Sequence, residues 1–481
     1  MWNLCIKISL IIAFSNLTLS VHAQETHFTD QRLNDIERYI NQGMADENIP
    51  GVSIALIESG RVIYTKGFGK GDNENSRISP QTPFQIASMT KSFSALLILQ
   101  LENDGKLSLD DKVVDHIHWF RTSDKSQSDQ ISIRHLLQHN SGFSTQSGNF
   151  TQNSQYRGAD ATERSVKALQ NSQLVSAPGS SYEYSNSNYH IVSHLIEVVE
   201  GAPYEAVIAA RIFQPLDMRN SFVQIPVNKT AEPAIGFPQW FGISVERPFI
   251  LGRMKMGDGG VSASAEDLSK YLLEVSQGEL GLVTKNMRDS LFRTDENIAH
   301  YGLGWQISTE GDMTVYEHGG NNGGFSSQFG FTDANSRKAD IGFVILTNYT
   351  SALHSQFIWN VRQTILGSER LAKKLNTTNL LSLIALYGTI LVLCFCIYRS
   401  IKTSKPTRTR FKHFIIPSLL IAHGYAMAYV IPGLNKINLF SIYPFFPDLA
   451  VGLIGCSALS ILLAVLMLIK LSTFWKVRQL D

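Results

Sequence analysis

The chain has 481 residues and a formal net charge of +1; 44% of the residues are hydrophobic and 17% are charged. This near-neutral charge argues against a nucleic-acid or other polyanionic partner, and the length allows two or three structural units. The cysteines are Cys5, Cys394, Cys396 and Cys456. The long region between the first two therefore has no disulfide and no cysteine–metal site. Because no metal-binding or nucleotide-binding motif is present either, we expect no metal and no cofactor.

Residues 1–23 are typical of a secretory signal. Lys7 supplies the positive end, residues 8–14 form a short apolar core, and residues 21–23 resemble a small-residue cleavage site. An uncleaved N-terminal anchor is the alternative, and Asn16 argues against it because it interrupts the apolar run. Either interpretation places the following domain outside the cytoplasm.

Periodic apolar residues predict helices and strands along residues 30–367. The predicted helices cover 30–44, 88–103, 131–137, 188–200 and 356–366. The predicted strands cover 51–57, 61–68, 303–308, 313–318, 325–331 and 341–347, and the polar segment 143–173 is expected to be irregular. Strands at both ends with helices between them predict an α+β domain. Its terminal strands would form one antiparallel sheet flanked by helices, and its middle part a mainly helical second lobe.

Three apolar stretches follow, near 379–398, 414–432 and 447–469, and each is about long enough to cross a bilayer. The segment between the first two is basic, which predicts a cytoplasmic location. Its basic residues are Arg399, Lys402, Lys405, Arg408, Arg410 and Lys412. A buried helical core is the alternative. The predicted units are a signal (1–23), a domain (24–367), a linker (368–378) and a membrane domain with three transmembrane helices (379–481).

Ser88 and Lys91 form the only Ser-x-x-Lys pattern in the chain. Residues three apart share one face of a helix, so the lysine amine would lie beside the serine hydroxyl. A serine becomes a nucleophile when a base takes its proton. A free lysine, with a pKa of about 10.4, becomes such a base only where burial or nearby positive charge lowers that value. The alternative is a polar helix start with Ser88 as the N-cap.

Tyr184 and Asn186 precede a predicted helix. In an extended segment these two side chains would point toward one cleft. There a tyrosine hydroxyl can relay protons, and an amide can hold Lys91 and a substrate carbonyl. A turn followed by a helix cap is the alternative interpretation.

A glycine-rich run, His318, Gly319, Gly320 and Asn321, follows a predicted strand. Glycine lets the backbone approach a ligand closely, and a backbone N–H in this run can complete an oxyanion hole. A glycine-rich hairpin is the alternative.

The ordered set of Ser88 and Lys91, Tyr184 and Asn186, and the run starting at His318 resembles the three active-site motifs of the penicillin-recognising serine hydrolases. This family includes class C β-lactamases, D-Ala-D-Ala carboxypeptidases, D-aminopeptidases and related esterases. Segments 133–142, 259–263 and 301–305 are similar to the family as well, so the resemblance spans about residues 30–367. His135 and His139, in the first of these segments, are expected to shape the junction between the lobes.

The resemblance implies that Ser88 is the nucleophile, Lys91 the base of acylation and Tyr184 a shared proton relay. It further implies that Asn186 contacts the substrate amide and that the backbone N–H groups of Ser88 and Asn321 form the oxyanion hole. Which of Lys91 and Tyr184 takes the first proton stays open.

The third motif departs from the family's Lys-Thr-Gly. His318 replaces a fixed positive charge, Gly319 lacks a hydroxyl that would bind a substrate carboxylate, and only Gly320 is retained. Because histidine is mostly neutral at pH 7, this departure argues against a true β-lactamase. It favours an esterase, or a peptidase with a relaxed demand for a carboxylate.

The sequence therefore predicts a membrane-anchored, extracytoplasmic, bacterial serine hydrolase that works through an acyl-enzyme. Its substrate would be an ester or a D-amino-acid amide or peptide, with peptidoglycan-derived peptides among the candidates. Two alternatives stay open. One is a slowly acylated sensor ectodomain for β-lactams or cell-wall peptides, and the other is a true β-lactamase.

Overall fold

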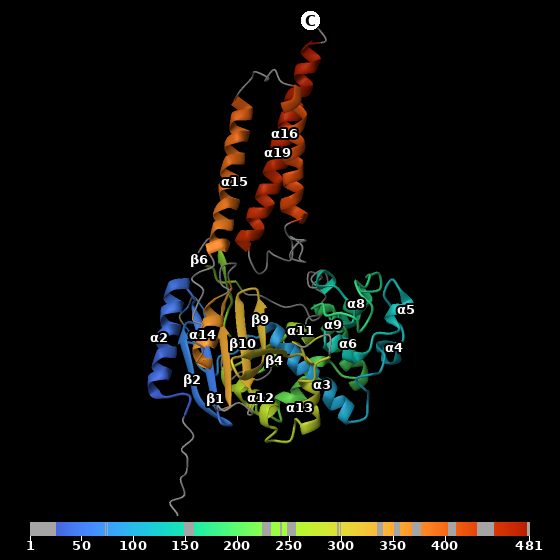
Figure 1. Cartoon of the computed structure of the whole chain (residues 1–481), viewed down its shortest axis with the longest axis vertical. Coiled ribbons are helices and arrows are strands. Elements are labelled where there is room, and N and C mark those ends of the chain that lie inside the picture. The colour runs from blue at the N-terminus through green and yellow to red at the C-terminus, as the bar shows by residue number, and fades with distance from the viewer. Residues whose placement is uncertain are drawn as a thin grey trace, which may run out of the picture.

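Figure 1 shows the computed structural model of the chain, in which a domain of strands and helices lies beside a group of long helices formed by the C-terminal part. The structure describes residues 26–478 except 73, 75, 149–157, 224–231, 241–242, 248–255, 296–297, 299, 334–339, 351–355, 368–376, 403–409 and 431–446. The predicted signal lies outside the described residues.

A six-stranded sheet in the order β2-β1-β11-β10-β9-β8 forms the centre of the domain, and all of its neighbouring strands are antiparallel. The strands are β1 (Gly51–Glu58), β2 (Arg61–Gly69), β8 (Gln306–Glu310), β9 (Met313–Asn322), β10 (Phe325–Thr332) and β11 (Ile341–Thr347). The first hairpin therefore pairs with a strand from the far end of the domain. This pairing confirms the predicted α+β architecture.

Helices cover both faces of the sheet (Figure 1). Alternate residues of a strand point to opposite faces. In β1, Ile54 packs with α2 (Asp30–Glu47) and α14 (Phe357–Leu366), whereas Ala55 packs in the core that contains α3 (Thr90–Asn103) and α12 (Ala265–Gln277). The sheet is therefore buried on both sides, and its second face supports the active-site region.

The predicted helical lobe is present beside the sheet, and α3 (Thr90–Asn103) runs into it with its residues through Leu101 buried. The other helices of this part are α4 (Val113–His116), α5 (Lys125–Ser128), α6 (Ile133–Leu137), α8 (Ala161–Lys167), α9 (Asn186–Glu200), α10 (Tyr204–Ile208), the π-helical turn η2 (Ala209–Phe213), α11 (Met256–Gly259) and α13 (Lys285–Leu291). Helix α8 falls within the segment 143–173 that was expected to be irregular, so that expectation is wrong there.

Two small three-stranded sheets complete the domain. Their strands are β3 (Phe84–Gln85), β7 (Val261–Ala263) and β4 (Phe222–Val223), and β12 (Tyr349–Thr350), β5 (Phe237–Trp240) and β6 (Ile243–Ser244). The first of these sheets leads directly into the segment that carries Ser88.

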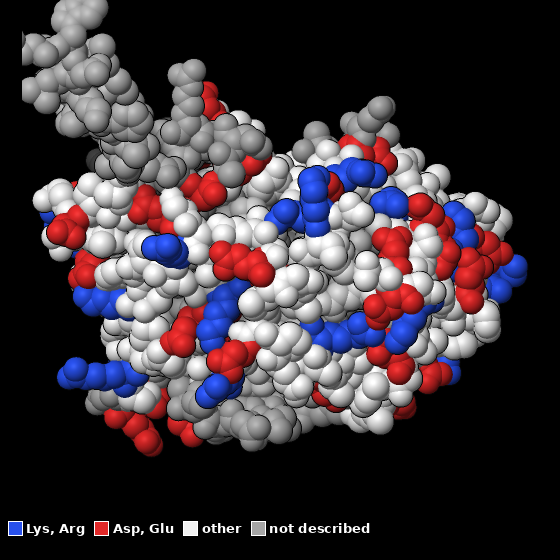
Figure 2. Space-filling model, turned by 90° about the horizontal axis from the view of Figure 1, so that it is seen from below, with Lys and Arg blue, Asp and Glu red and all other residues white. Residues whose placement is uncertain are grey.

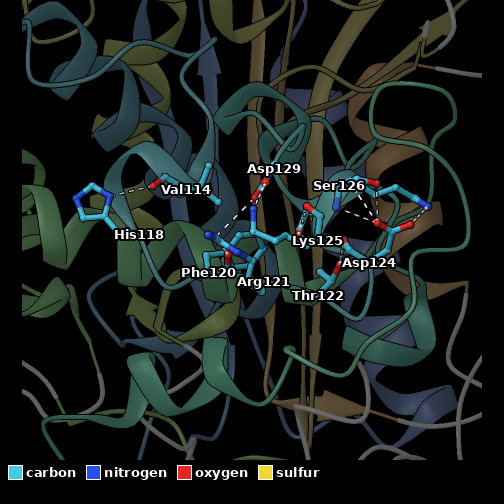
Figure 3. A network of polar contacts seen from close by, with 11 residues as sticks. Val114, His118, Phe120, Arg121, Thr122, Asp124, Lys125, Ser126 and Asp129 are labelled. Carbon is cyan, nitrogen blue, oxygen red and sulfur yellow. Dashed lines mark hydrogen bonds and ion pairs between the residues drawn. The ribbon is translucent and has the colours of Figure 1, made fainter.

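The outer surface of the helical lobe is held by local polar contacts (Figure 3). The Asp124 carboxylate caps α5 by accepting a hydrogen bond from the Ser126 N–H at 2.9 Å, and Lys125 pairs with Asp129 at 2.8 Å. A cap of this kind stabilises the start of the helix, and an exposed ion pair contributes little. These contacts stabilise the lobe and lie on its surface.

The C-terminal part forms three helical segments: α15 (Thr377–Lys402), α16 (Arg410–Tyr425) continuing into η4 (Ala426–Val430), and α19 (Pro447–Arg478). His423 contacts Ser460 at 2.8 Å, and the Cys456 thiol lies 3.4 Å from the Leu386 carbonyl oxygen, so α19 packs on both other helices. Within the described residues, one helix, over Leu449–Ile469, is long and apolar enough to cross a membrane. Three transmembrane helices therefore stay a prediction.

Of the element boundaries that differ from the sequence prediction, those of β9 and α9 affect the site. Strand β9 extends to Asn322 instead of ending at His318, because the glycine-rich run pairs with β10. Helix α9 begins at Asn186 rather than at position 188, so the assumption of an extended segment through Asn186 is wrong.

Candidate active site

Ser88 lies in a single 3₁₀ turn, η1 (Ala87–Met89), which leads directly into α3. The preceding residue, Ala87, has φ = 47°, a value that L-residues other than glycine rarely adopt. Such strained backbone clusters at functional sites, where the surrounding structure holds it in place. The turn therefore presents Ser88 at the end of a buried helix.

Lys91 lies beside Ser88, as the three-residue spacing predicts. Its Nζ donates a hydrogen bond to Ser88 Oγ at 3.2 Å and another to the Asp258 carbonyl oxygen at 2.9 Å. The Lys91 side chain is completely buried, and Nζ lies 5.1 Å from the ring centre of Tyr184 and 5.5 Å from that of Tyr189. The amine is therefore held in one direction, toward the serine hydroxyl.

A cavity of about 390 Å³ opens at Ser88. It is lined by Ser88, Tyr184, Gln306, His318, Gly319, Gly320, Asn321, Ser326, Ser327 and Ile358. Six of the eight predicted site residues thus meet at one cavity, and Lys91 lies directly behind its nucleophile. No lysine or arginine is among the described residues that line it.

Asn186 is the eighth predicted residue, and it does not line this cavity. It is the first residue of α9 and is buried. Its Oδ1 has no hydrogen-bond partner among the described residues. The start of α9 explains this placement, since the helical turn directs Asn186 away from the side to which Tyr184 points. A substrate contact by Asn186 stays a prediction.

The opposite wall of the cavity is the last part of β9. Pairing with β8 ends at Glu317, so the run from His318 to Asn322 has a strand partner on the β10 side and contacts η1. This placement leaves a strand edge beside Ser88, where a backbone N–H of Asn321 can meet an oxyanion.

The two glycines of this wall differ in the space around them. A Cβ on Gly320 would lie 2.0 Å from the carbonyl oxygen of Ile86, which overlaps that atom. A Cβ on Gly319 would meet only the Ser327 carbonyl oxygen, at 3.8 Å, an ordinary contact distance. Gly320 is therefore required for the close approach of β9 to η1, whereas position 319 has room for a side chain.

His318 is buried and uncharged at neutral pH. Burial, followed by the nearby Lys91 charge, lowers the pKa of His318 to about 3. Its Nδ1 lies 2.7 Å from the Gly319 carbonyl oxygen, which can only accept, so Nδ1 carries the proton. Its Nε2 lies 3.1 Å from the Tyr301 hydroxyl and accepts from it. Both ring nitrogens are therefore engaged within the protein.

His139 lies between the lobes, where the sequence placed it. Its ring centre is 4.3 Å from that of Tyr184, and its Nδ1 contacts the Ser185 N–H at 3.2 Å and the Asn188 amide at 3.0 Å. Burial, and then the Lys91 charge, lower the pKa of His139 well below its ordinary value. The neutral ring thus packs against the predicted proton relay.

The sequence reasoning missed the roles of Tyr301 and Asp258. Tyr301 lies in one of the segments that resemble the family, and it fixes the tautomer of His318 through the contact described above. Asp258 holds Lys91 through a backbone carbonyl, which any residue type supplies, so its identity carried no signal. Among the described residues, no group of three or more His, Cys, Asp or Glu is placed to hold a metal ion.

Comparison with known proteins identifies the family of the domain. Residues 36–364 match the family described as Beta-lactamase. Protein flp of Staphylococcus aureus (strain MRSA252) is 28% identical over 434 residues, which cover 85% of each chain. The penicillin-binding protein homologue from Pyrococcus abyssi has a similar structure, with a TM-score of 0.61 and 27% identity over 71% of this chain and 78% of that one.

A second similar structure is that of EstCE1, a hydrolase with promiscuous acyltransferase activity. It is 19% identical, with a TM-score of 0.60, and the match covers 70% of this chain and 99% of that one, so it shows the fold alone. The chain belongs to the Beta-lactamase family, whose members are generally serine hydrolases. The resemblance inferred from the motifs is thereby confirmed.

Proposed function

We propose that the protein is a membrane-anchored serine hydrolase that forms an acyl-enzyme on Ser88 with an ester or a D-amino-acid amide or peptide. The observation that carries the proposal is the 3.2 Å contact between Lys91 Nζ and Ser88 Oγ at the mouth of a cavity. A nucleophile within hydrogen-bond reach of a base is the arrangement that covalent acyl transfer requires.

In the acylation step, Ser88 Oγ attacks the substrate carbonyl carbon while its proton passes to the Lys91 amine. The developing oxyanion is placed for the backbone N–H groups of Ser88 and Asn321, which lie on the two walls of the cavity. Tyr184 lines the same cavity beside Lys91, so a proton can pass through it to the departing alcohol or amine.

In the deacylation step, a water molecule attacks the Ser88 ester and gives up its proton to the same Lys91–Tyr184 pair. Collapse of the second oxyanion releases the acid and returns the proton to Ser88. The same two groups thus act as base and then as acid in each half of the reaction.

The cavity supports a substrate that has no carboxylate opposite the His318 wall. His318 is neutral with both ring nitrogens occupied, Gly319 has no hydroxyl, and no described lining residue is a lysine or arginine. A carboxylate placed there would lose its hydration without a charge to replace it. An ester or an amide with an uncharged end does not incur this cost.

The charge on one face of the domain argues against a polyanionic substrate at that face. Figure 2 views the face of the domain that lies away from α15, α16 and α19, where Lys and Arg are interspersed with Asp and Glu. A polyanion-binding face would carry a continuous positive region instead.

A substrate panel tests the proposal. The full-length chain, purified in a mild detergent, is assayed with aryl and short-chain esters, D-amino-acid amides, D-Ala-D-Ala peptides and a chromogenic cephalosporin. We expect ester or amide turnover that Ser88→Ala abolishes. Stable stoichiometric acylation by a β-lactam without turnover of any of the four classes would replace the hydrolase by the sensor.

The membrane topology needs its own experiment. We propose three spans, with the basic segment 399–412 in the cytoplasm and the catalytic domain outside. The packing of α19 against α15 and α16 supports a single bundle. A reporter active only in the cytoplasm should work when fused after Arg408 and be silent after Asn438; the reverse pattern would place the domain in the cytosol.

A further inference from the structure

A short helix, α11 (Met256–Gly259), lies directly behind Lys91. The carbonyl oxygen of its Asp258 accepts the 2.9 Å hydrogen bond from Lys91 Nζ. The carboxylate of the same residue lies 3.2 Å from Nε2 of His190, on α9. The side chains of His190 and Asp258 are 0% and 4% exposed. Asp258 thus links the proposed base, Lys91, to a buried polar contact with His190.

The helix is clamped between α3 and α9. On the α3 side, Ser94 Oγ donates to the Gly257 carbonyl oxygen at 2.7 Å, next to the carbonyl that holds Lys91. On the α9 side, a Cβ on Gly257 would lie 2.7 Å from the Cβ of Ser193, so the two backbones are in close contact. Two successive carbonyl groups of α11 therefore face polar side chains of α3.

A helix of four residues has little stability of its own, because forming its first turn costs more than one hydrogen bond returns. The direction of the Asp258 carbonyl consequently depends on tertiary contacts. A buried carboxylate is strongly disfavoured without a partner. The contact with His190 therefore restrains the Asp258 side chain and, through it, the position of the Asp258 backbone carbonyl.

We infer that His190 and Asp258 are positioning residues for acylation: their buried contact fixes the carbonyl group that aims the Lys91 amine at Ser88. The inference rests on the proposed function. Neither residue touches the cavity at Ser88, since both lie behind Lys91. Their effect reaches the reaction through the orientation of the amine, on which proton transfer from Ser88 depends.

If His190 and Asp258 position the Lys91 amine, removing them changes the acylation rate, whereas removing a contact that only stabilises the fold does not. Loss of a stabilising contact lowers the melting temperature and leaves the rate constant of the folded enzyme unchanged. A misdirected Lys91 slows the covalent step and leaves reversible binding of the reagent intact. A 1 Å misplacement of a reacting group costs up to about 100-fold in rate.

The test is the acylation of the full-length chain by a fluorophosphonate, measured as the saturating first-order rate and the half-saturating concentration. The variants are Asp258→Ala, His190→Ala, the double variant and Asp258→Asn, each with its melting temperature. His194→Ala is the matched control. It removes another buried histidine one turn further along α9, which lies 3.9 Å from Glu197 and contacts Thr162 and Trp119.

We expect each alanine variant to lower the saturating rate about 10- to 100-fold with the half-saturating concentration unchanged within about twofold. The double variant should be no slower than the slower single variant, because the two residues act as one contact. Asp258→Asn retains an acceptor for His190 and should recover most of the rate, and His194→Ala should acylate at the wild-type rate.

Wild-type rates in both folded alanine variants would overturn the inference, as would losses that multiply in the double variant or an asparagine variant as slow as the alanine one. If Asp258→Ala does not fold, Asp258→Glu replaces it. The longer side chain displaces the carbonyl while keeping the charge, so a wild-type rate there would also overturn the inference. A wild-type chain that is not labelled at Ser88 would instead overturn the proposed function, and the inference with it.

Discussion

The two walls of the cavity are built in different ways. The wall formed by η1 and α3 holds the reactive groups in a fixed arrangement, with a positive φ at Ala87 and a buried Lys91 whose amine has two defined partners. The wall formed by the end of β9 carries a neutral His318 and an open position at Gly319.

This difference suggests separate roles for the two walls: the first carries the groups that form the acyl-enzyme, and the second influences which substrates bind. Acyl transfer needs a nucleophile and a base within a few tenths of an ångström of their working positions, so the first wall tolerates little change. The second wall meets the part of the substrate that does not react, and its charge can differ without altering the covalent step. The predictions below change one wall at a time, in order of decreasing effect.

Ser88→Ala should abolish covalent labelling by a fluorophosphonate, because it removes the hydroxyl that forms the acyl-enzyme. Intact-mass spectrometry measures the added group. Ser92→Ala is the control, since Ser92 is a buried serine of the adjoining helix α3 whose Oγ donates to the Met89 carbonyl oxygen. Labelling that persists in Ser88→Ala would show that another residue is the nucleophile.

Lys91→Ala should slow acylation by about 10²–10⁴-fold, the range for losing a general base. Stopped-flow measurement of the labelling rate tests this, with circular dichroism as a check on folding. Combining Lys91→Ala with Tyr184→Phe should cost less than the product of the two separate losses, because the groups share one proton path. Multiplicative losses would mean that they act independently.

Gly320→Ala and Gly319→Ala form a matched pair on the second wall. The new methyl group overlaps the Ile86 carbonyl oxygen at position 320 and makes only an ordinary contact, with the Ser327 carbonyl oxygen, at position 319. Gly320→Ala should therefore lower the free energy of unfolding by about 1–3 kcal/mol and displace β9 from Ser88. Equal melting temperatures and equal ester turnover for the two variants would contradict the close approach described here.

His318 should make stability depend on pH. Its pKa is about 3 in the folded protein, and an ordinary histidine in the unfolded chain titrates near 6.5. The unfolded chain binds more protons between these values, so the free energy of unfolding falls as the pH drops from about 6.5 toward 3, by at most about 1.4 kcal/mol per unit.

Melting temperatures measured from pH 7 to pH 4.5 test this dependence. In His318→Gln the decline toward low pH should be shallower than in the wild type. The exposed His118, which contacts the Val114 carbonyl oxygen (Figure 3), provides the control variant His118→Gln, with a wild-type profile expected. A His318→Gln profile parallel to the wild-type profile would show that His318 does not remain neutral in the fold.

The smallest expected effect is a change of selectivity. His318→Lys with Gly319→Thr restores a charge and a hydroxyl on the second wall, where position 319 has room. We expect the ratio of β-lactam to ester turnover to rise by the equivalent of about 1–3 kcal/mol, the contribution of one charged hydrogen bond. Gly319→Thr alone is the control. An unchanged ratio would mean that selectivity is set elsewhere.

Local spacing allowed the sequence to predict the first wall. Ser88 and Lys91 are three residues apart, and helical geometry places such residues together in almost any fold. The α+β architecture was predictable for a similar reason, since alternating strands at both ends of the domain have few ways to bury their apolar faces. The neutrality of His318 was also expected, although only from the general behaviour of histidine.

Tertiary structure decided the remaining features, because they depend on residues far apart in the chain or on backbone atoms. The carbonyl that holds Lys91 comes from a residue 167 positions away, and a carbonyl has no identity that a sequence pattern can show. The tautomer of His318 depends on Tyr301, and the placement of Asn186 depends on where α9 begins. Burial, which moves the pKa of His318 so far below its ordinary value, exists only once both lobes have packed around it.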